Sequence, residues 1–290
     1  TFTRASSATR VNQSGLIELV ATGVPRLDYT GGGCPSLLLE PQQTQLYGET
    51  ATMATQTKTV TAVEHTVGFY GTGTITFTGT YAGSLVGTGI NDRVELTFTP
   101  TAGSLISTVS GSVTSSQLVT GDYLGSYIPN TTTGTITRIA DAASKTGLSS
   151  YINSTEGVLY AQIAALTEGG ATATLSISDG SLSNRVLIVF SSGELRGQFT
   201  NSSGTSIIDT SGSVIKDFNK VACVYTSTTF KLFVNGSKIS GTATVTSLTG
   251  LNKISLDRGD GVLSFEGRVK ELRVYSTALT DAELITLTTL

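Results

Sequence analysis

Residues 220–236 read KVACVYTSTTFKLFVNG and contain two runs of strand-forming residues, 220–225 and 230–234. A short polar segment separates the two runs, and Asn235-Gly236 follows the second run directly. Asn-Gly between β-rich runs favours a type I′ hairpin turn, because both residues tolerate a positive φ angle. We therefore expect consecutive antiparallel strands in this part of the chain.

Strand-length segments continue on the N-terminal side of this hairpin. They cover residues 158–163, 173–177, 185–190 and 195–199. On the C-terminal side, Thr280 and Glu283 have the spacing of a capping box, in which each side chain satisfies a backbone group at the start of a helix. The last part of the chain is therefore expected to be a sheet structure that ends in a short helix.

The C-terminal half resembles laminin G-like jelly rolls of the concanavalin A type. The hairpin at 220–236, the sequence FEGRVKELRVY at 265–275 and the sequence ALTDAEL at 278–284 carry the resemblance to their hairpin, closing strand and final helical turn. The Trp that these families commonly have before the hairpin is missing, and Phe218 or Asn219 stands in its place. The resemblance implies a laminin G-like module over residues 150–290.

A second pattern of strands precedes this module. From about Gln56 to Gln117, β-branched and small residues alternate, and breaks with Gly or Pro recur about every ten residues. Clear examples are residues 59–63, 73–79, 94–99 and 105–109. Alternation of this kind is typical of a small antiparallel sandwich.

Two phrases in the N-terminal half resemble signatures of structural proteins in tailed-phage virions and prophages. The first begins with TFTRASSATRVN at 1–12 and continues with GLIE, PRLDY and LLLEPQQT at 15–18, 25–29 and 37–44. It departs from the family at Gln43 and Gln45, where Arg and Asn are usual. The second consists of QLVTGDY, SYIP and ITRIAD at 117–123, 126–129 and 136–141. The resemblance implies a tail fibre, spike or capsid-decoration protein.

These patterns together predict an all-β protein with two antiparallel β-sandwich (jelly-roll) modules in tandem. The predicted parts are an extended, turn-rich lead-in over 1–46, a small carbohydrate-binding-like sandwich over 47–127, a linker over 128–149 and the laminin G-like module over 150–290.

The composition excludes several classes of function. Only 13% of the residues are charged and the net charge is −3, without a Lys/Arg cluster that could neutralise several phosphates, so we expect no nucleic-acid partner. The longest apolar run, residues 186–190, is too short to span a bilayer, so we expect no membrane insertion. Cys34 and Cys223 are expected to be free thiols.

Catalysis has little support in the sequence, and we predict that the chain is not an enzyme. Glycosidases need two carboxylates roughly 5 to 10 Å apart. The Glu-x-Asp-x-x-Glu signature of laminarinase-type jelly rolls is absent, and Glu266 and Glu271 would lie on opposite faces of a regular strand. A Ser/His/Asp triad would have to use His65, the single histidine, which we interpret as an ordinary exposed or hydrogen-bonded residue.

Calcium is a more plausible ligand, because many carbohydrate-binding jelly rolls hold this ion with Asp side chains and loop carbonyls. The candidate loop is Asp257-Arg258-Gly259-Asp260-Gly261, with Asp257 and Asp260 as metal ligands. The same order of residues is also typical of an ordinary hairpin turn.

Sugar binding usually relies on aromatic rings that stack on pyranose rings, with polar groups for the hydroxyls. The chain has no Trp, so the candidate rings are Tyr70, Tyr81 and Tyr123 in the first module, and Tyr225 or Phe230 in the second. For each ring, packing in the core is the alternative interpretation.

Two classes of function remain open. The first is a non-enzymatic component of the virion surface, and hence extracellular, that forms a homo-oligomer such as a trimer, contacts other virion subunits and attaches to host-surface or environmental glycans. A purely structural role in subunit packing is a variant of it. The second is a polysaccharide-binding module of a secreted bacterial enzyme or adhesin. Stable oligomers would favour the first class.

Overall fold

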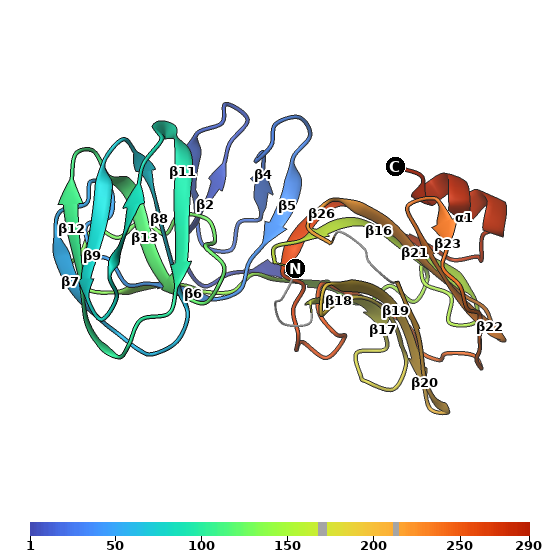
Figure 1. The fold of residues 1–290 in the computed structure, drawn as a ribbon. Helices are drawn as coiled ribbons and strands as arrows, with labels where there is room; N and C mark the ends of the chain where they lie inside the picture. Colours follow the sequence, from blue (N-terminus) through green and yellow to red (C-terminus); the bar gives the residue numbers. More distant parts are fainter. Residues whose placement is uncertain (168–172, 211–214) are drawn as a thin grey trace. The chain divides into compact units, whose positions relative to one another are not determined.

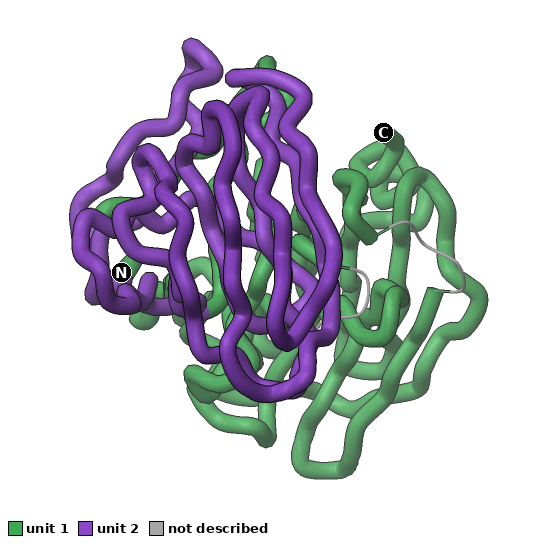
Figure 2. Tube along the Cα trace, turned by 60° about the vertical axis from the view of Figure 1, so that its left-hand side comes forward, with its two compact units in different colours: residues 1–3, 24–41, 141–290 green, residues 4–23, 42–140 purple. Residues whose placement is uncertain are grey.

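The computed structural model describes residues 1–167, 173–210 and 215–290, and in these residues nearly all of the regular secondary structure is β-strand (Figure 1). It divides into two compact units, each built from separate segments of the chain (Figure 2). Unit 1 contains residues 1–3, 24–41 and 141–290, and unit 2 contains residues 4–23 and 42–140. The expected all-β class with antiparallel sandwiches is confirmed.

Unit 1 contains two antiparallel sheets. The first has the strand order β1-β15-β25-β17-β18-β19-β20. Its strands are β1 (Phe2–Thr3), β15 (Ala142–Lys145), β25 (Lys253–Ser255), β17 (Ala173–Ser178), β18 (Arg185–Ser191), β19 (Glu194–Asn201) and β20 (Gly204–Asp209).

The second sheet has the order β23-β22-β21-β16-β26-β5-β4, and β24 also pairs with β22. Its strands are β23 (Ser237–Lys238), β22 (Thr229–Val234), β21 (Asn219–Tyr225), β16 (Gly157–Ala165), β26 (Gly267–Tyr275), β5 (Ser36–Leu39), β4 (Arg26–Asp28) and β24 (Ala243–Thr244).

The core of unit 1 lies between these two sheets, because alternate residues of each strand point inward. Leu159, Ala161 and Ile163 of β16 meet Ile177 of β17 and Ile188 of β18 in one buried cluster. The strand-length apolar segments of the sequence are thus the inner layers of a sandwich.

The other face of the second sheet carries helix α1, Asp281–Thr288 (Figure 1). Leu284 of the helix is buried with Tyr160 of β16 in a separate cluster. The predicted capping box is confirmed, since Thr280 Oγ1 accepts from the Glu283 N–H and the Glu283 carboxylate accepts from the Thr280 N–H. Strand β16 is therefore covered on both faces.

The hairpin predicted at 220–236 is also present. Strand β21 pairs with β22, and β22 turns back into β23 at Asn235 and Gly236. Their φ angles are +49° and +79°, as a type I′ turn requires.

Unit 2 contains a four-stranded sheet, β10-β9-β12-β7, and a three-stranded sheet, β11-β8-β13. The buried residues of the two sheets form one cluster that includes Phe69 of β8, Phe77 of β9 and Leu105 of β12. Two pairs, β2–β3 and β6–β14, complete the unit. The bounds are β2 (Ala8–Val11), β3 (Ile17–Val20), β6 (Gln43–Gln45), β7 (Gln56–Val60), β8 (His65–Gly71), β9 (Thr74–Gly79), β10 (Gly83–Val86), β11 (Gly89–Phe98), β12 (Gly103–Ser110), β13 (Thr114–Thr120) and β14 (Ile136–Arg138).

The segments expected to be a lead-in and a linker belong to the two units instead. Within residues 1–46, strand β1 pairs with β15 and strand β5 pairs with β26 in unit 1, whereas β2 and β3 pair with each other in unit 2. Within residues 128–149, β14 pairs with β6 in unit 2 and β15 belongs to unit 1. Strands β1, β15 and β5 are short, and each of them extends one of the two large sheets of unit 1.

A buried ion cluster joins two segments of unit 1, residues 24–41 and residues 141–290. The Arg26 guanidinium donates to the Glu40 carboxylate at 2.5 Å and to the Asp141 carboxylate, and all three side chains are 0% exposed. Asp141 also accepts from the Glu40 backbone N–H at 2.9 Å. Although burial disfavours its charge, the two carboxylates hold the pKa of Arg26 above its ordinary value. The cluster therefore attaches residues 24–41 to the start of the long C-terminal segment.

Two further sequence predictions concern the cysteines and membrane-spanning segments. Cys34 is an exposed free thiol and Cys223 a buried free thiol, as expected. In the described parts of the chain, no helix has the length and apolar character needed to cross a membrane.

Candidate functional site

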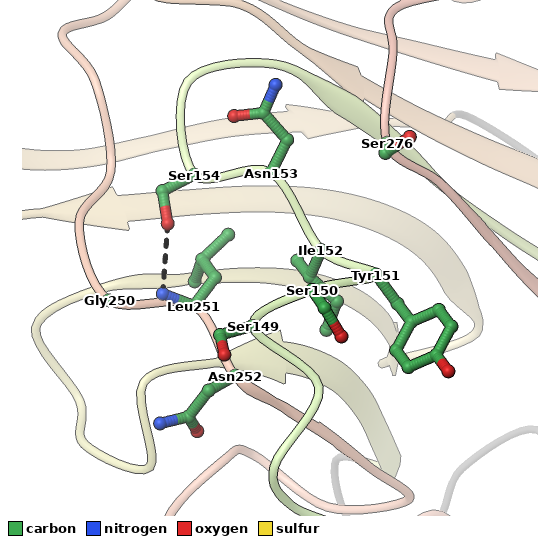
Figure 3. A pocket seen from close by; sticks show the side chains of 10 residues that line it. All are labelled: Ser149, Ser150, Tyr151, Ile152, Asn153, Ser154, Gly250, Leu251, Asn252 and Ser276. Atoms are coloured by element: carbon green, nitrogen blue, oxygen red, sulfur yellow. Dashed lines mark hydrogen bonds between the residues drawn. The ribbon is translucent and has the colours of Figure 1, made fainter.

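Unit 1 has a hollow of about 470 Å³ between two loops and the end of a strand. Its walls come from residues 149–154, residues 250–252 and Ser276 (Figure 3). Serine and asparagine side chains make up most of this lining, and one aromatic ring, Tyr151, is among them. The volume lies within the roughly 300–1,000 Å³ of small-molecule sites.

Tyr151 presents its ring to solvent, with 69% of its surface exposed. It lies in the loop between β15 and β16, where the backbone N–H groups of Tyr151 and Ile152 both donate to the Leu148 carbonyl. Ile152 is 4% exposed and belongs to the core of unit 1. Because the turn directs Ile152 inward, its neighbour Tyr151 remains outside, at the edge of the labelled group in Figure 3.

Hydrogen bonds hold the backbone of the hollow in place. The Tyr225 hydroxyl donates to the Asn153 carbonyl at 2.6 Å, and the Leu251 N–H donates to Ser154 Oγ at 3.0 Å. The Leu148 N–H donates to the Asn252 carbonyl at 2.8 Å. Burial, and secondarily the charge of Glu156, raise the pKa of Tyr225 far above its ordinary value, so this donor keeps its proton. The two loops are thus preorganised before any ligand binds.

Several polar side chains of the lining are available to a ligand. In the described structure, the hydroxyls of Ser149, Ser150 and Ser276 and the side-chain amide of Asn252 have no hydrogen-bond partner in the protein. Asn153 uses its Oδ1, which accepts from the Thr155 N–H and hydroxyl, and keeps its Nδ2 available. Hydroxyls and amides can both donate and accept, which suits a ligand rich in hydroxyl groups.

Two of the rings predicted to bind sugar are buried in the core of unit 1. Tyr225 is 1% exposed and Phe230 is 0% exposed. Phe230 packs against Phe199, with their ring centroids 5.8 Å apart. The prediction is wrong for both residues, because inward-facing positions of β21 and β22 leave no ring face for a sugar. Tyr225 instead positions the backbone of the hollow through its hydroxyl.

The other three predicted rings lie in unit 2 and are half-buried. Tyr81 stacks on Phe98 at a centroid distance of 4.3 Å and packs against the core. Tyr70 lies on β8 beside β11 and β13, and Tyr123 lies in the loop after β13. Their part in sugar binding stays a prediction.

The predicted calcium loop has its carboxylates engaged within the loop. Asp257 is 8% exposed, and its Oδ1 accepts from the N–H groups of Gly259 and Gly261 at 2.6 and 3.2 Å. Asp260 pairs with Arg258 at 2.7 Å, and these hydrogen bonds hold the pKa of Asp260 below its ordinary value. In the described residues, no three His, Cys, Asp or Glu side chains gather as a group that could hold a metal. A calcium ion would have to compete with Arg258 for Asp260.

The residues considered for catalysis are partly or fully buried, or they are paired with a neighbouring side chain. His65 is 1% exposed, with Nδ1 2.7 Å from the Val63 carbonyl and its ring stacked on Phe98. Glu271 pairs with Arg273, two positions along β26. Glu266 precedes β26, and burial raises the pKa of its carboxyl.

Comparisons with known proteins agree with the fold of unit 1. Residues 158–285 match the family described as the concanavalin A-like lectin/glucanases superfamily. No curated protein matches the chain significantly.

Solved structures that match part of the chain include three from sialidases. The CBM40 of the Ruminococcus gnavus IT-sialidase, bound to α2,3-sialyllactose, is 21% identical, with 48% of this chain and 84% of that chain covered and a TM-score of 0.40. The leech intramolecular trans-sialidase is 23% identical, with 47% and 23% covered and a TM-score of 0.39. The NanB sialidase of Streptococcus pneumoniae is 17% identical, with 51% and 26% covered and a TM-score of 0.41.

With TM-scores below 0.5, these likenesses support no conclusion about ligand or activity. The two packed antiparallel sheets, together with the family match, identify the fold of the C-terminal part as a β-sandwich. Residues 158–285 match the model of the concanavalin A-like lectin/glucanases superfamily, and the described residues of unit 1 form two packed antiparallel sheets.

Proposed function

We propose that the chain is a non-enzymatic carbohydrate-binding protein that holds a sugar at the hollow beside Tyr151. The observation that carries this proposal is an aromatic ring, 69% exposed, beside serine and asparagine side chains that lack partners in the described protein. The hollow lies in the unit that contains the lectin/glucanase-type domain.

The chemistry of the hollow fits a sugar ring. The apolar face of a pyranose stacks on an aromatic ring, and its hydroxyls need hydrogen-bond donors and acceptors at the edge of that ring. Tyr151 supplies the ring, while Ser149, Ser150 and Asn252 supply hydroxyl and amide groups. A shallow site of this kind binds weakly by itself, and several copies displayed together would raise the avidity.

The setting of this activity is a second part of the proposal. The family match supports a polysaccharide-binding module of a secreted protein better than it supports a virion protein. The virion-surface setting, with a tail fibre or capsid decoration that attaches to host glycans, rests on the two sequence phrases at 1–44 and 117–141. Both settings are extracellular. A stable homo-oligomer in solution, measured by light scattering, would favour the virion setting, and a monomer the appended module.

The test of binding uses the 290-residue chain displayed at high density on beads against a panel of polysaccharides and cell-envelope glycans. Tyr151→Ala is expected to reduce binding at least tenfold, because stacking on the ring is lost. Tyr29→Ala removes a partly buried ring elsewhere in unit 1 and serves as the control that should bind like the unmodified chain.

The outcomes of this experiment separate the candidate roles. Equal binding by the Tyr151 and Tyr29 variants would exclude the hollow, and the same assay with Tyr70→Ala, Tyr81→Ala and Tyr123→Ala would then test the rings of unit 2. Absence of binding to every glycan at high avidity would contradict the proposal and favour a subunit-packing role. Loss of binding with a calcium chelator, reproduced by Asp257→Asn, would support calcium at the Asp257–Asp260 loop.

A further inference from the structure

Among the residues that the structure describes, the lining of the hollow beside Tyr151 contains no charged side chain. Its ten residues are serines, asparagines, one glycine, one tyrosine and the apolar Ile152 and Leu251. We propose that this site selects uncharged sugars and rejects sugars that carry a carboxylate, such as sialic and uronic acids. This inference rests on the proposed function and names the class of sugar that the same site accepts.

The charged groups next to the lining reinforce this selection. A Cβ atom at Gly250 would lie 3.7 Å from Cβ of Asp179, which places an acidic residue directly behind that wall. Burial raises the pKa of Asp179, but hydrogen bonds from Ser181 and Asn184 outweigh it and hold the pKa below its ordinary value. Asp179 is therefore an anion at neutral pH.

A second acidic residue is close in sequence to the lining. Glu156 follows the lining segment 149–154 by two positions, and its carboxylate accepts from the Ala278 N–H at 3.1 Å, two residues beyond Ser276. The cation nearest in sequence is Lys253, next to Asn252, and its Nζ donates to the Gly259 carbonyl at 2.7 Å. A ligand carboxylate would thus meet acidic neighbours, and the adjacent ammonium group is already engaged.

The energetic consequence follows from desolvation. A carboxylate that leaves water must recover the loss through a cation or through several strong hydrogen bonds. Neutral hydroxyls and amides recover part of it, and nearby carboxylates add repulsion. A neutral sugar has no such loss. We therefore expect at least a tenfold preference for the neutral member of a matched pair, which corresponds to about 1.4 kcal/mol.

The experiment compares matched glycans on beads with the full chain. The pairs are lactose with 3′-sialyllactose, and carboxyl-reduced polygalacturonic acid with its parent polymer. Measurements at low and at high salt separate the screened effect of the net charge of −3 from selection inside the site. Tyr151→Ala in every arm shows which binding occurs at the hollow.

Three outcomes are possible, and each decides something. Tyr151-dependent binding that is at least tenfold stronger for the neutral members, at both salt concentrations, is the expected result. Tyr151-dependent binding that is equal for both members, stronger for the acidic members, or stronger for the neutral members at low salt alone would overturn this inference and leave the proposed function intact. Absence of Tyr151-dependent binding to all of these glycans and to the wider panel would overturn the proposed function and this inference together.

A variant that adds a cation provides an independent test. Ser150 is exposed in the lining, so Ser150→Arg should fold and should strengthen binding to the acidic members several-fold. The matched control is Ser227→Arg, which adds the same charge at an exposed turn outside the lining. Equal effects of the two variants would mean that overall charge, and not the site, decides between neutral and acidic sugars.

Discussion

Replacement of Arg26 by Met should strongly destabilise unit 1. The side chains of Arg26, Glu40 and Asp141 are 0% exposed, and the guanidinium lies 2.5 Å from Glu40 Oε2. Met has a similar length but no charge, so Arg26→Met leaves two carboxylates buried without their cation. Removal of one partner from a buried ion pair costs about 3–5 kcal/mol. For a unit of this size, that loss lowers the melting temperature by roughly 6–20 °C.

Arg10→Met is the matched control for this variant. Arg10 pairs with Glu18 at 3.3 Å on the β2–β3 hairpin, but these side chains are 25% and 44% exposed. A solvent-exposed pair contributes about 0–1 kcal/mol. Urea unfolding followed by circular dichroism measures both variants, with separate transitions fitted if the two units unfold apart. If the free energies of unfolding of the two variants agree within about 1 kcal/mol, the reasoning about the buried cluster is refuted.

Three further changes test other features of unit 1. Tyr225→Phe keeps the ring in the core but leaves the Asn153 carbonyl without its donor. Calorimetry should show that the free energy of unfolding falls by about 1–2 kcal/mol, and the bead assay should show weaker glycan binding. Unchanged values in both assays would contradict the positioning role of Tyr225. Burial raises the pKa of Glu266, so the stability it contributes is present at low pH and is lost as the pH rises through the raised value. Glu266→Gln should therefore raise the melting temperature at pH 7 but not below about pH 4, and equal shifts at both pH values would argue against this account. Thr280→Ala removes the N-cap of α1 and should destabilise the helix by about 1 kcal/mol. Faster hydrogen exchange in the helix should reveal this loss. Unaltered exchange would mean that the packing of Leu284 alone holds the helix.

Local patterns in the sequence were sufficient to predict the regular part of unit 1. The turn at Asn235–Gly236 and the capping box of Thr280 and Glu283 depend on residues that are neighbours in the chain. The strands at 158–163 and 185–190 follow from their runs of apolar residues. Such features need no knowledge of distant segments.

The arrangement of the N-terminal residues depends on contacts that sequence patterns do not contain. Arg26 and Asp141 are 115 positions apart, and no local rule pairs them. Gln45, which departs from the virion-protein phrase, is 0% exposed, accepts from the Leu118 N–H and donates to the Ser116 carbonyl. Short segments that looked like an independent lead-in are therefore parts of the two units.

The candidate site was missed for a related reason. Tyr151 follows Ser149 and Ser150 in a loop, and nothing in this sequence distinguishes an exposed ring from a buried one. Its exposure results from Ile152, which occupies the core, and from a hollow that residues 250–252 complete a hundred positions later. The rings of Tyr225 and Phe230 lie in clear strand patterns, but the first sheet, which packs against these strands, decides which face of each strand points inward.

The place of β5 in unit 1 has a consequence for synthesis of the chain on the ribosome. Leu37 and Gly267 belong to the two strands that pair as β5 and β26, yet they are 230 positions apart. At roughly 5–20 residues per second, the partner of β5 is translated roughly 10–50 seconds later. All residues of unit 2 have been synthesised by residue 140, so that unit can fold while β4 and β5 still wait. During this interval, β5 can pair with β4, but its other edge, which later pairs with β26, is open to chaperone binding or to pairing between nascent chains.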